Sequence, residues 1–171
     1  KCESFEEGLQ RILFFNQVFW QTGHKLNGLG RLDKVLNDLY YNDLNNDVIN
    51  KEKSLKLIKK FLNTLHQYYW YKSNELMGDT GQIIVLGGKE ENEEYFCNDL
   101  TYLFIEALQD LNIPDPKILL RVCDKTPHNL MEKALKSITC GIGSPLLSND
   151  DKIISNLINL KLFYHHLIKE D

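Results

Sequence analysis

Three glycine-bearing tracts carry the residues of this chain that are most able to contact a ligand. Asn27 and Gly28 open the first tract, Leu86 and Gly87 end the second, and the third runs from Gly141 to Pro145. Each tract stands where the chain leaves one expected element and enters the next, and glycine there allows a sharp turn or a close approach of the backbone. Binding groups commonly lie on such connections, so these tracts are the first candidates for a functional site.

Arg121 is a charged residue inside an apolar run, residues 118–123. A guanidinium that is drawn into the interior needs an anionic partner. The sequence therefore predicts either a structural ion pair or a contact to an anionic ligand, and it favours neither. Asp33 follows the first glycine tract and is interpreted as a helix-start residue near the positive end of the helix dipole.

Other reactive patterns are weak. Gly87-Gly88 lacks a nucleotide-binding motif and is followed by the acidic stretch 89–94, which would repel phosphate. His165 and His166 are neighbours, so on a helix they point about 100° apart and do not form a metal-binding pair. Four widely spaced cysteines give no zinc or dithiol spacing. No catalytic residue and no metal site are predicted.

The composition indicates a single globular domain over residues 1–171, with 43% hydrophobic and 26% charged residues. A net charge of −4 argues against a nucleic-acid partner. No apolar run approaches the roughly 20 residues of a membrane span, and the acidic N-terminus is not a signal peptide. The expected location is cytoplasmic, with reduced cysteines. Because the sequence has no initiator Met, we expect a piece of a longer chain.

The pattern of apolar residues divides the chain into a helical half, 1–80, and a strand–helix half, 81–171. Helices are predicted over 4–23, 32–40 and 51–77, the first with Ser4 and Glu7 as a capping box. In the second half, apolar runs predict strands at 82–86, 118–123 and 146–147. Helices at 98–111, 126–139 and 150–166 alternate with them, the second starting with Thr126 as cap and Pro127 as first residue. This order predicts an α/β fold whose three short parallel strands form an incomplete sheet.

Several motifs, taken in order, resemble those of the glycyl radical enzymes, the group of pyruvate formate-lyase, glycerol dehydratase and choline lyase. The matching motifs are Gly30-Arg31-Leu32-Asp33, Leu39-Tyr40-Tyr41 with Asp43, Leu86-Gly87-Gly88, Asn98 to Leu103, Pro116-Lys117-Ile118 with Arg121, and Gly141 to Pro145 with Asn149-Asp150. Lys34 departs from the family pattern, which has Gln there. The resemblance spans nearly the whole chain.

The resemblance implies a partial sector of a ten-stranded α/β barrel from the central part of such an enzyme. The family's thiyl-forming Cys and its radical Gly would lie beyond Asp171, so the piece alone is expected to be inactive. Asn27, Gly28, Leu86 and Gly87 would line one substrate cavity, with Arg121 binding an anionic group or tying strands together.

For the parent, the resemblance implies a lyase or acyltransferase-like enzyme of anaerobic metabolism that cleaves a C–C, C–O or C–N bond. No cofactor would be bound directly. Its glycyl radical would be installed by an S-adenosylmethionine and iron–sulfur activating enzyme. The expected partners are a small-molecule substrate, that activating enzyme and a second copy in a homodimer. Two alternatives stay open: a non-catalytic interaction or assembly domain that keeps the scaffold, and an unrelated helical binding module without neighbouring strands.

Overall fold

The computed structural model describes residues 2–24, 26–68 and 81–167, with side chains up to residue 160. Helices and strands follow in the order α1 (Phe5–Gln21), β1 (Asn27–Arg31), α2 (Leu32–Val35), α3 (Asn37–Asn45), α4 (Lys51–Tyr68), β2 (Gln82–Gly87), α5 (Asp99–Leu111), β3 (Lys117–Val122), α6 (His128–Ser137), the π-helical turn η1 (Ile138–Ile142), β4 (Leu146–Asn149) and α7 (Asp150–Leu167). The predicted helix-rich α/β class is confirmed. Within the described part of the chain, no helix is long and apolar enough to cross a membrane.

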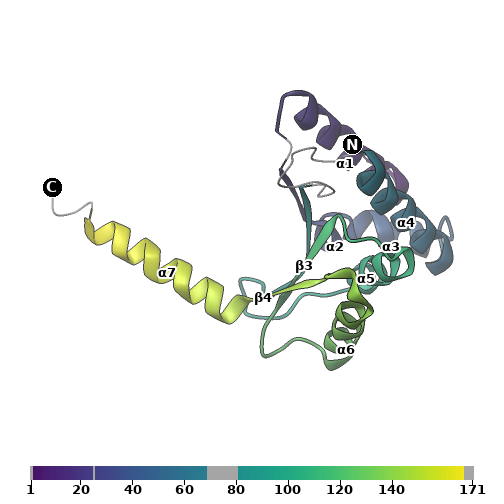
Figure 1. Cartoon of the computed structure of the whole chain (residues 1–171). Helices are drawn as coiled ribbons and strands as arrows, with labels where there is room; N and C mark the ends of the chain where they lie inside the picture. Colours follow the sequence, from purple (N-terminus) through teal and green to yellow (C-terminus); the bar gives the residue numbers. More distant parts are fainter. Residues whose placement is uncertain (1, 25, 69–80, 168–171) are drawn as a thin grey trace.

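The strands form one parallel sheet in the order β1-β2-β3-β4, so sheet order follows chain order (Figure 1). Strands β2, β3 and β4 match the three predicted ones, and β2 and β3 are neighbours, which rules out the alternative of an unrelated helical module. The interpretation of the first glycine tract, residues 27–30, as a connection between elements was wrong. These residues form β1, with an irregularity between Gly28 and Gly30, because they pair with the apolar strand β2.

The two faces of the sheet are in different environments. Alternate residues of β2 and β3, namely Ile84, Leu86, Ile118 and Leu120, are fully buried in the core beneath the helices. On the opposite face Ile83 of β2 remains 42% exposed. At the margins, β1 and β4 each pair on one side only among the described residues. The sheet is therefore open at both edges and covered on one face, as expected of a sector of a larger barrel.

Capping side chains define the starts of α1 and α5, and the cap of α1 agrees only in part with the predicted one. The Ser4 hydroxyl accepts the backbone N–H of Glu7 at 3.2 Å, as predicted. The Glu7 carboxylate accepts the N–H of Glu3 at 2.7 Å rather than that of Ser4, which corrects the predicted capping box. Asn98 caps α5, and its side chain and that of Thr101 form a reciprocal box with the backbone.

Two helix boundaries differ from the prediction, and a third lies outside the described residues. The helix expected over 32–40 is divided at Leu36 into α2 and α3. Helix α6 begins at His128 rather than Pro127, because the Thr126 hydroxyl accepts the N–H of Cys123 at 2.8 Å instead of capping the helix. Helix α4 is described as far as Tyr68, and the predicted continuation to 77 lies outside the described residues.

Asp33 is the polar centre of the fold, with no exposed surface. Its Oδ2 atom accepts the backbone N–H of Gly87 at 2.7 Å and the hydroxyl of Thr101 at 2.8 Å. These two bonds join α2, the end of β2 and the start of α5. Burial raises the pKa of the Asp33 carboxyl, while the hydrogen bond from Gly87 acts in the opposite direction.

Two further polar side chains, Asn98 and Asp43, tie helices together. The Asn98 amide donates to the backbone oxygen of Asp33 and to the side-chain oxygen of Asn37, both at 2.8 Å. Asp43 of α3, which is 4% exposed, accepts the N–H of Phe5 at the start of α1 at 2.8 Å. The motif residues Asp33, Asp43 and Asn98 therefore hold the frame of this sector.

Replacing Asp33 by Ala should destabilise the chain strongly. The change leaves the buried N–H of Gly87 without its acceptor and takes from the Thr101 hydroxyl one of its two acceptors, the other being Oδ1 of Asn98. We expect a loss of roughly 2–3 kcal/mol in the free energy of unfolding. The exposed Asp38→Ala, on α3, should change it by less than about 0.5 kcal/mol. Urea unfolding followed by circular dichroism measures both. Equal stability of the two variants would contradict the central role of Asp33.

Asp33 should also give the fold a distinct pH dependence. Because its pKa in the folded chain lies above the ordinary 3.8, its protonated form favours the folded state. This contribution to the free energy of unfolding is complete below pH 3.8 and is lost as the pH rises through the raised pKa of Asp33. The free energy of unfolding of the native chain, relative to that of Asp33→Asn, should therefore fall over this window. A difference between the two curves that stays constant or rises with pH would show that the Asp33 pKa is not raised.

Candidate functional site

Charged side chains gather where β1 and β2 end. Glu90, just beyond β2, forms an ion pair with Arg31 at 2.7 Å and a second one with Lys34. The ring of Phe96 lies under the Arg31 guanidinium, with 5.3 Å between that group and the ring centroid. The hydrogen bond from Lys34, with help from Arg31, lowers the pKa of the Glu90 carboxyl. The cluster joins the carboxyl ends of two neighbouring strands.

A second charged cluster lies around Arg121, at the carboxyl ends of β2, β3 and β4. The Arg121 Nε atom donates to Oδ1 of Asp150 at 2.8 Å, and Oδ2 of Asp150 accepts the backbone N–H of Lys89 at 2.7 Å. Asp150 is 2% exposed and Arg121 is partly buried. Of the two interpretations left open by the sequence, this geometry favours a structural ion pair, with Asp150 at the start of α7 as the partner.

Carboxylates next to this cluster form a possible cation site. Ligand atoms of Cys123, Asp124 and Asp151 lie within 4.8 Å of one another. The Lys89 ammonium donates to Asp151 at 3.0 Å, and this bond raises the pKa of Lys89 and lowers that of Asp151. Because Lys89 already neutralises Asp151, a metal ion would have to compete with the ammonium for the same oxygen atoms.

The second glycine tract has a structural reason for its composition. Gly87 and Gly88 have φ angles of +63° and +115°, which side-chain-bearing residues rarely adopt. A Cβ atom on Gly88 would lie 2.7 Å from the Arg121 guanidinium carbon, and one on Gly87 would lie 2.5 Å from the Tyr95 hydroxyl. That hydroxyl donates to the backbone oxygen of Arg121 at 2.6 Å, and burial raises its pKa. Close packing therefore accounts for both glycines.

The predicted site residues fall into two separate places. Gly87 pairs with Arg121 at the carboxyl ends of β2 and β3, and Leu86 beside them is fully buried under the helices. Asn27 instead pairs with Gln82, the first residue of β2, so it lies at the opposite end of the strands together with Gly28. The sequence analysis expected Asn27, Gly28, Leu86 and Gly87 to line one substrate cavity. Among the described residues, the structure brings Leu86 and Gly87 close to Arg121 and places Asn27 and Gly28 at the other end of the strands.

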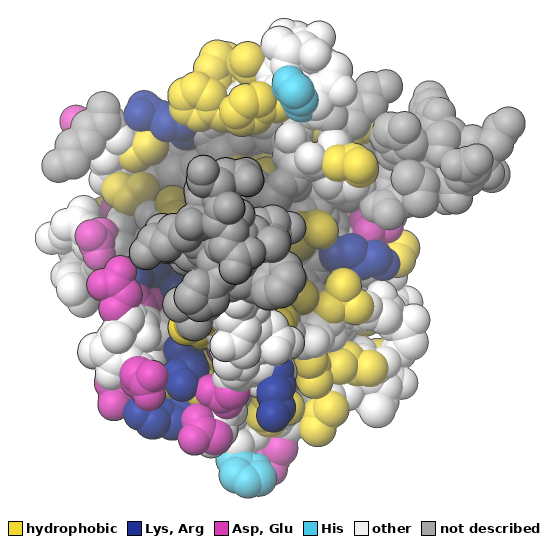
Figure 2. Space-filling model, turned by 90° about the vertical axis from the view of Figure 1, so that its left-hand side faces the viewer, with side chains coloured by type: hydrophobic (Ala, Val, Ile, Leu, Met, Phe, Trp, Pro, Cys, Tyr) yellow, Lys and Arg dark blue, Asp and Glu magenta, His cyan; other side chains and the backbone are white. Residues whose placement is uncertain are grey.

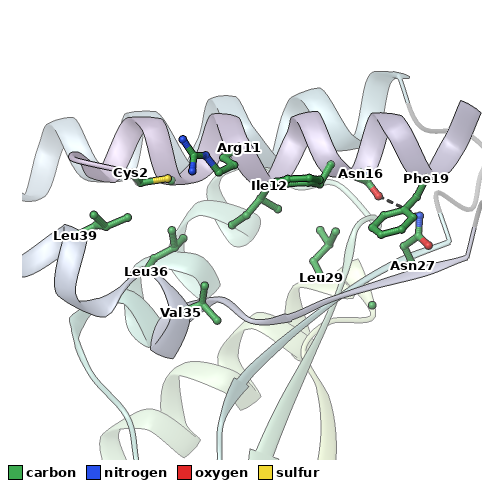
Figure 3. Close-up of a pocket in the computed structure, with 13 residues that line it drawn as sticks. Cys2, Arg11, Ile12, Asn16, Phe19, Asn27, Leu29, Val35, Leu36 and Leu39 are labelled. Carbon is green, nitrogen blue, oxygen red and sulfur yellow. Dashed lines mark hydrogen bonds between the residues drawn. The ribbon is translucent and has the colours of Figure 1, made fainter.

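Asn27 and Gly28 contribute to a groove of about 450 Å³ between α1, β1 and α2 (Figure 3). Its walls are mainly apolar and include Ile12, Phe15, Phe19, Leu29, Val35 and Leu36. The Asn27 side chain donates to the side-chain oxygen of Asn16 at 3.2 Å across one end of the groove. Its size is that of a small-molecule site.

Several residues that shape the strand ends were missed or underestimated by the sequence analysis. Asp33 was interpreted as a helix-start residue, and Lys89 and Glu90 only as part of an acidic stretch. Asp150 was noted only as part of a family motif at the start of the last predicted helix. For Lys89, Glu90 and Asp150 the available signal was their position shortly after predicted strands, since carboxyl ends of parallel strands meet at one edge of a sheet. Asp33 gave no such signal, because β1 was not predicted. Figure 2 shows acidic and basic side chains close together on the side of the molecule that faces left in Figure 1.

The tight fit of Gly88 gives a direct test of this geometry. Gly88→Ala should lower the free energy of unfolding by roughly 1–3 kcal/mol, because the new methyl group meets Arg121 in a strained backbone conformation. Gly28→Ala is the matched control, since a Cβ atom there meets nothing within 4 Å. Thermal melting of both variants makes the comparison. If they melt at the same temperature, the described packing of Gly88 on Arg121 is wrong.

Comparison with known proteins places this arrangement in a wider group. The chain is 27% identical over 164 residues to (2S)-3-sulfopropanediol dehydratase of Klebsiella oxytoca, covering 91% of this chain and 20% of that protein. It is 24% identical over 162 residues to isethionate sulfite-lyase of Nitratidesulfovibrio vulgaris, covering 90% of this chain and 19% of that protein. The chain thus spans about a fifth of the length of these relatives.

Solved structures give the same result for the fold. A solved structure from work on 1,2-propanediol dehydration in Roseburia inulinivorans superposes on this chain with a TM-score of 0.86 and 25% sequence identity. The match covers 92% of this chain and 20% of that chain. The glycerol-bound form of the B12-independent glycerol dehydratase of Clostridium butyricum superposes with a TM-score of 0.79 and 22% sequence identity. That match covers 92% of this chain and 20% of the dehydratase chain. The family model "pyruvate formate lyase-like" matches residues 1–167. The chain therefore belongs to the pyruvate formate lyase-like family of glycyl radical enzymes.

Proposed function

We propose that this chain forms part of the wall around the substrate cavity of a glycyl radical enzyme that cleaves a C–C, C–O or C–N bond. The observation that carries the proposal is the open sheet. Four parallel strands are covered by helices on one face and unpaired at both margins among the described residues. Nearly all of this chain superposes on a fifth of a much longer chain.

The carboxyl ends of the strands are the proposed cavity side. In open parallel sheets, ligands bind beyond these ends. Gly87 and Arg121 lie there, held by Tyr95 and Asp150. We propose that the backbone at Gly87 shapes the cavity and that Leu86, being buried, acts only by fixing that backbone. Arg121 would orient the strand ends through its ion pair and thus serve as a positioning residue.

Asn27 and Gly28 have a different proposed role, because they lie at the amino ends of the strands. They are proposed to contact small molecules only through the groove beside α1.

The radical chemistry would come from outside these residues. A glycyl radical supplies hydrogen abstraction, and it would be installed by an S-adenosylmethionine and iron–sulfur activating enzyme in an anaerobic, cytoplasmic setting. As part of the cavity wall, this chain would help to exclude water from the cavity and would hold the strand ends in place. A small-molecule substrate, the activating enzyme and a second copy of the parent are the proposed partners. Both lyase and acyltransferase-like reactions fit this role.

The parent protein, treated anaerobically with its activating enzyme, should show the electron paramagnetic resonance signal of a glycyl radical. It should then consume one of a panel of candidates comprising 1,2-propanediol, glycerol, sulfopropanediol, isethionate and trans-4-hydroxy-L-proline. The 171-residue chain alone, treated identically, should give neither signal nor turnover, because an open sector does not enclose a water-free cavity.

Two results would overturn the proposal. Turnover by the 171 residues alone would show that the chain holds a complete catalytic centre. A folded parent that gives no radical signal would favour the alternative, a non-catalytic assembly domain that keeps the scaffold. Arg121→Gln in the parent separates positioning from chemistry. It should preserve the radical signal and lower kcat/KM.

A further inference from the structure

The groove between α1, β1 and α2 contains a polar group that the proposed function does not use. Asn16 of α1 lines the groove and is 2% exposed. Its Nδ2 atom is buried and has no hydrogen-bond partner among the described residues. A buried amide donor without an acceptor is costly, so the position calls for an oxygen atom from outside the described residues.

The neighbouring hydrogen bonds fix which end of the Asn16 amide is unpaired. The Asn27 Nδ2 atom donates to the backbone oxygen of His24 at 2.9 Å, which identifies it as the nitrogen end of the Asn27 amide. The same atom lies 3.2 Å from the Asn16 side chain, which must therefore present its oxygen to Asn27. The remaining Asn16 group is the NH₂ donor, so a partner must be an acceptor.

The groove also has a positive charge on its wall. Arg11 lies five residues before Asn16 on α1, about 7.5 Å along the helix axis. Its guanidinium has no ion pair or hydrogen bond among the described residues. No carboxylate is among the residues that line the groove. An unpaired cation and an unpaired donor favour an anion over a cation.

We propose that this groove binds a small apolar carboxylate. The apolar body would lie against Phe15, Leu29 and Val35, and the carboxylate would accept the Asn16 N–H in the positive field of Arg11. A volume of about 450 Å³ and mainly apolar walls fit one such molecule. The proposal is independent of radical chemistry at the other end of the strands, so neither result decides the other.

Titration of the 171-residue chain with octanoate tests the proposal, with octylammonium and octanol as probes of the same length. Nitrogen–proton correlation spectra report the Asn16 side-chain amide directly. We expect octanoate to shift that resonance and to bind roughly tenfold more tightly than either other probe, since hydrogen bonds to charged groups are the stronger ones. Equal affinities, or no shift of the Asn16 resonance, would overturn the proposal.

Two variants complete the test. Asn16→Asp keeps the shape of the side chain but removes the donor, and it should weaken octanoate binding roughly tenfold or more. Arg11→Gln, at an exposed position that should not affect folding, should weaken octanoate binding but leave octanol unchanged. Lys56→Gln, an exposed cation on α4, is the matched control and should have no effect. If Arg11→Gln and Lys56→Gln bind octanoate alike while both remain folded, the groove does not select an anion.

Discussion

The buried carboxylate of Asp33 is the interaction on which the rest of this sector depends. It lies at the start of α2, yet it accepts hydrogen bonds from the end of β2 and from the first turn of α5. Three elements that are far apart in the chain are thereby fixed to one oxygen atom. The cost of burying the carboxyl is visible in its raised pKa, and these charge-assisted hydrogen bonds offset it in part.

The charged clusters at the strand ends also join elements that are distant in the chain, again through carboxylates. Glu90 joins β1 to the segment after β2, and Asp150 joins β3 and that same segment to α7. Family motifs therefore correspond largely to internal ties in this chain. Gly88 is conformationally required, Arg121 has an internal carboxylate partner, and Asn98 caps a helix while holding Asp33. A resemblance based on these residues identifies a scaffold more directly than it identifies a reaction.

The sequence predicted the fold where a local pattern decided the structure. The apolar runs of β2 and β3 and the cap at Ser4 are such cases. Strand β1 was missed because Asn27–Arg31 contains two glycines and becomes a strand only by pairing with β2. The partner of Arg121 was left open for a related reason. Asp150 is 29 residues away in the sequence, and only the parallel arrangement of the strands brings the two together. The buried donor of Asn16 gave no sequence signal, because an Asn on an amphipathic helix is ordinarily solvated.

The agreement between sheet order and chain order has a consequence for how the polypeptide is made. Each strand adds to the margin left by the strand before it, so its pairing partner has already been synthesised when it leaves the ribosome. Growth from the N-terminus then needs no rearrangement of earlier pairs, and domains fold mostly in that direction during translation. Among the four described strands, the margin at β4 forms last, and until it is paired it is the place where nascent chains would be most exposed to wrong pairing with one another.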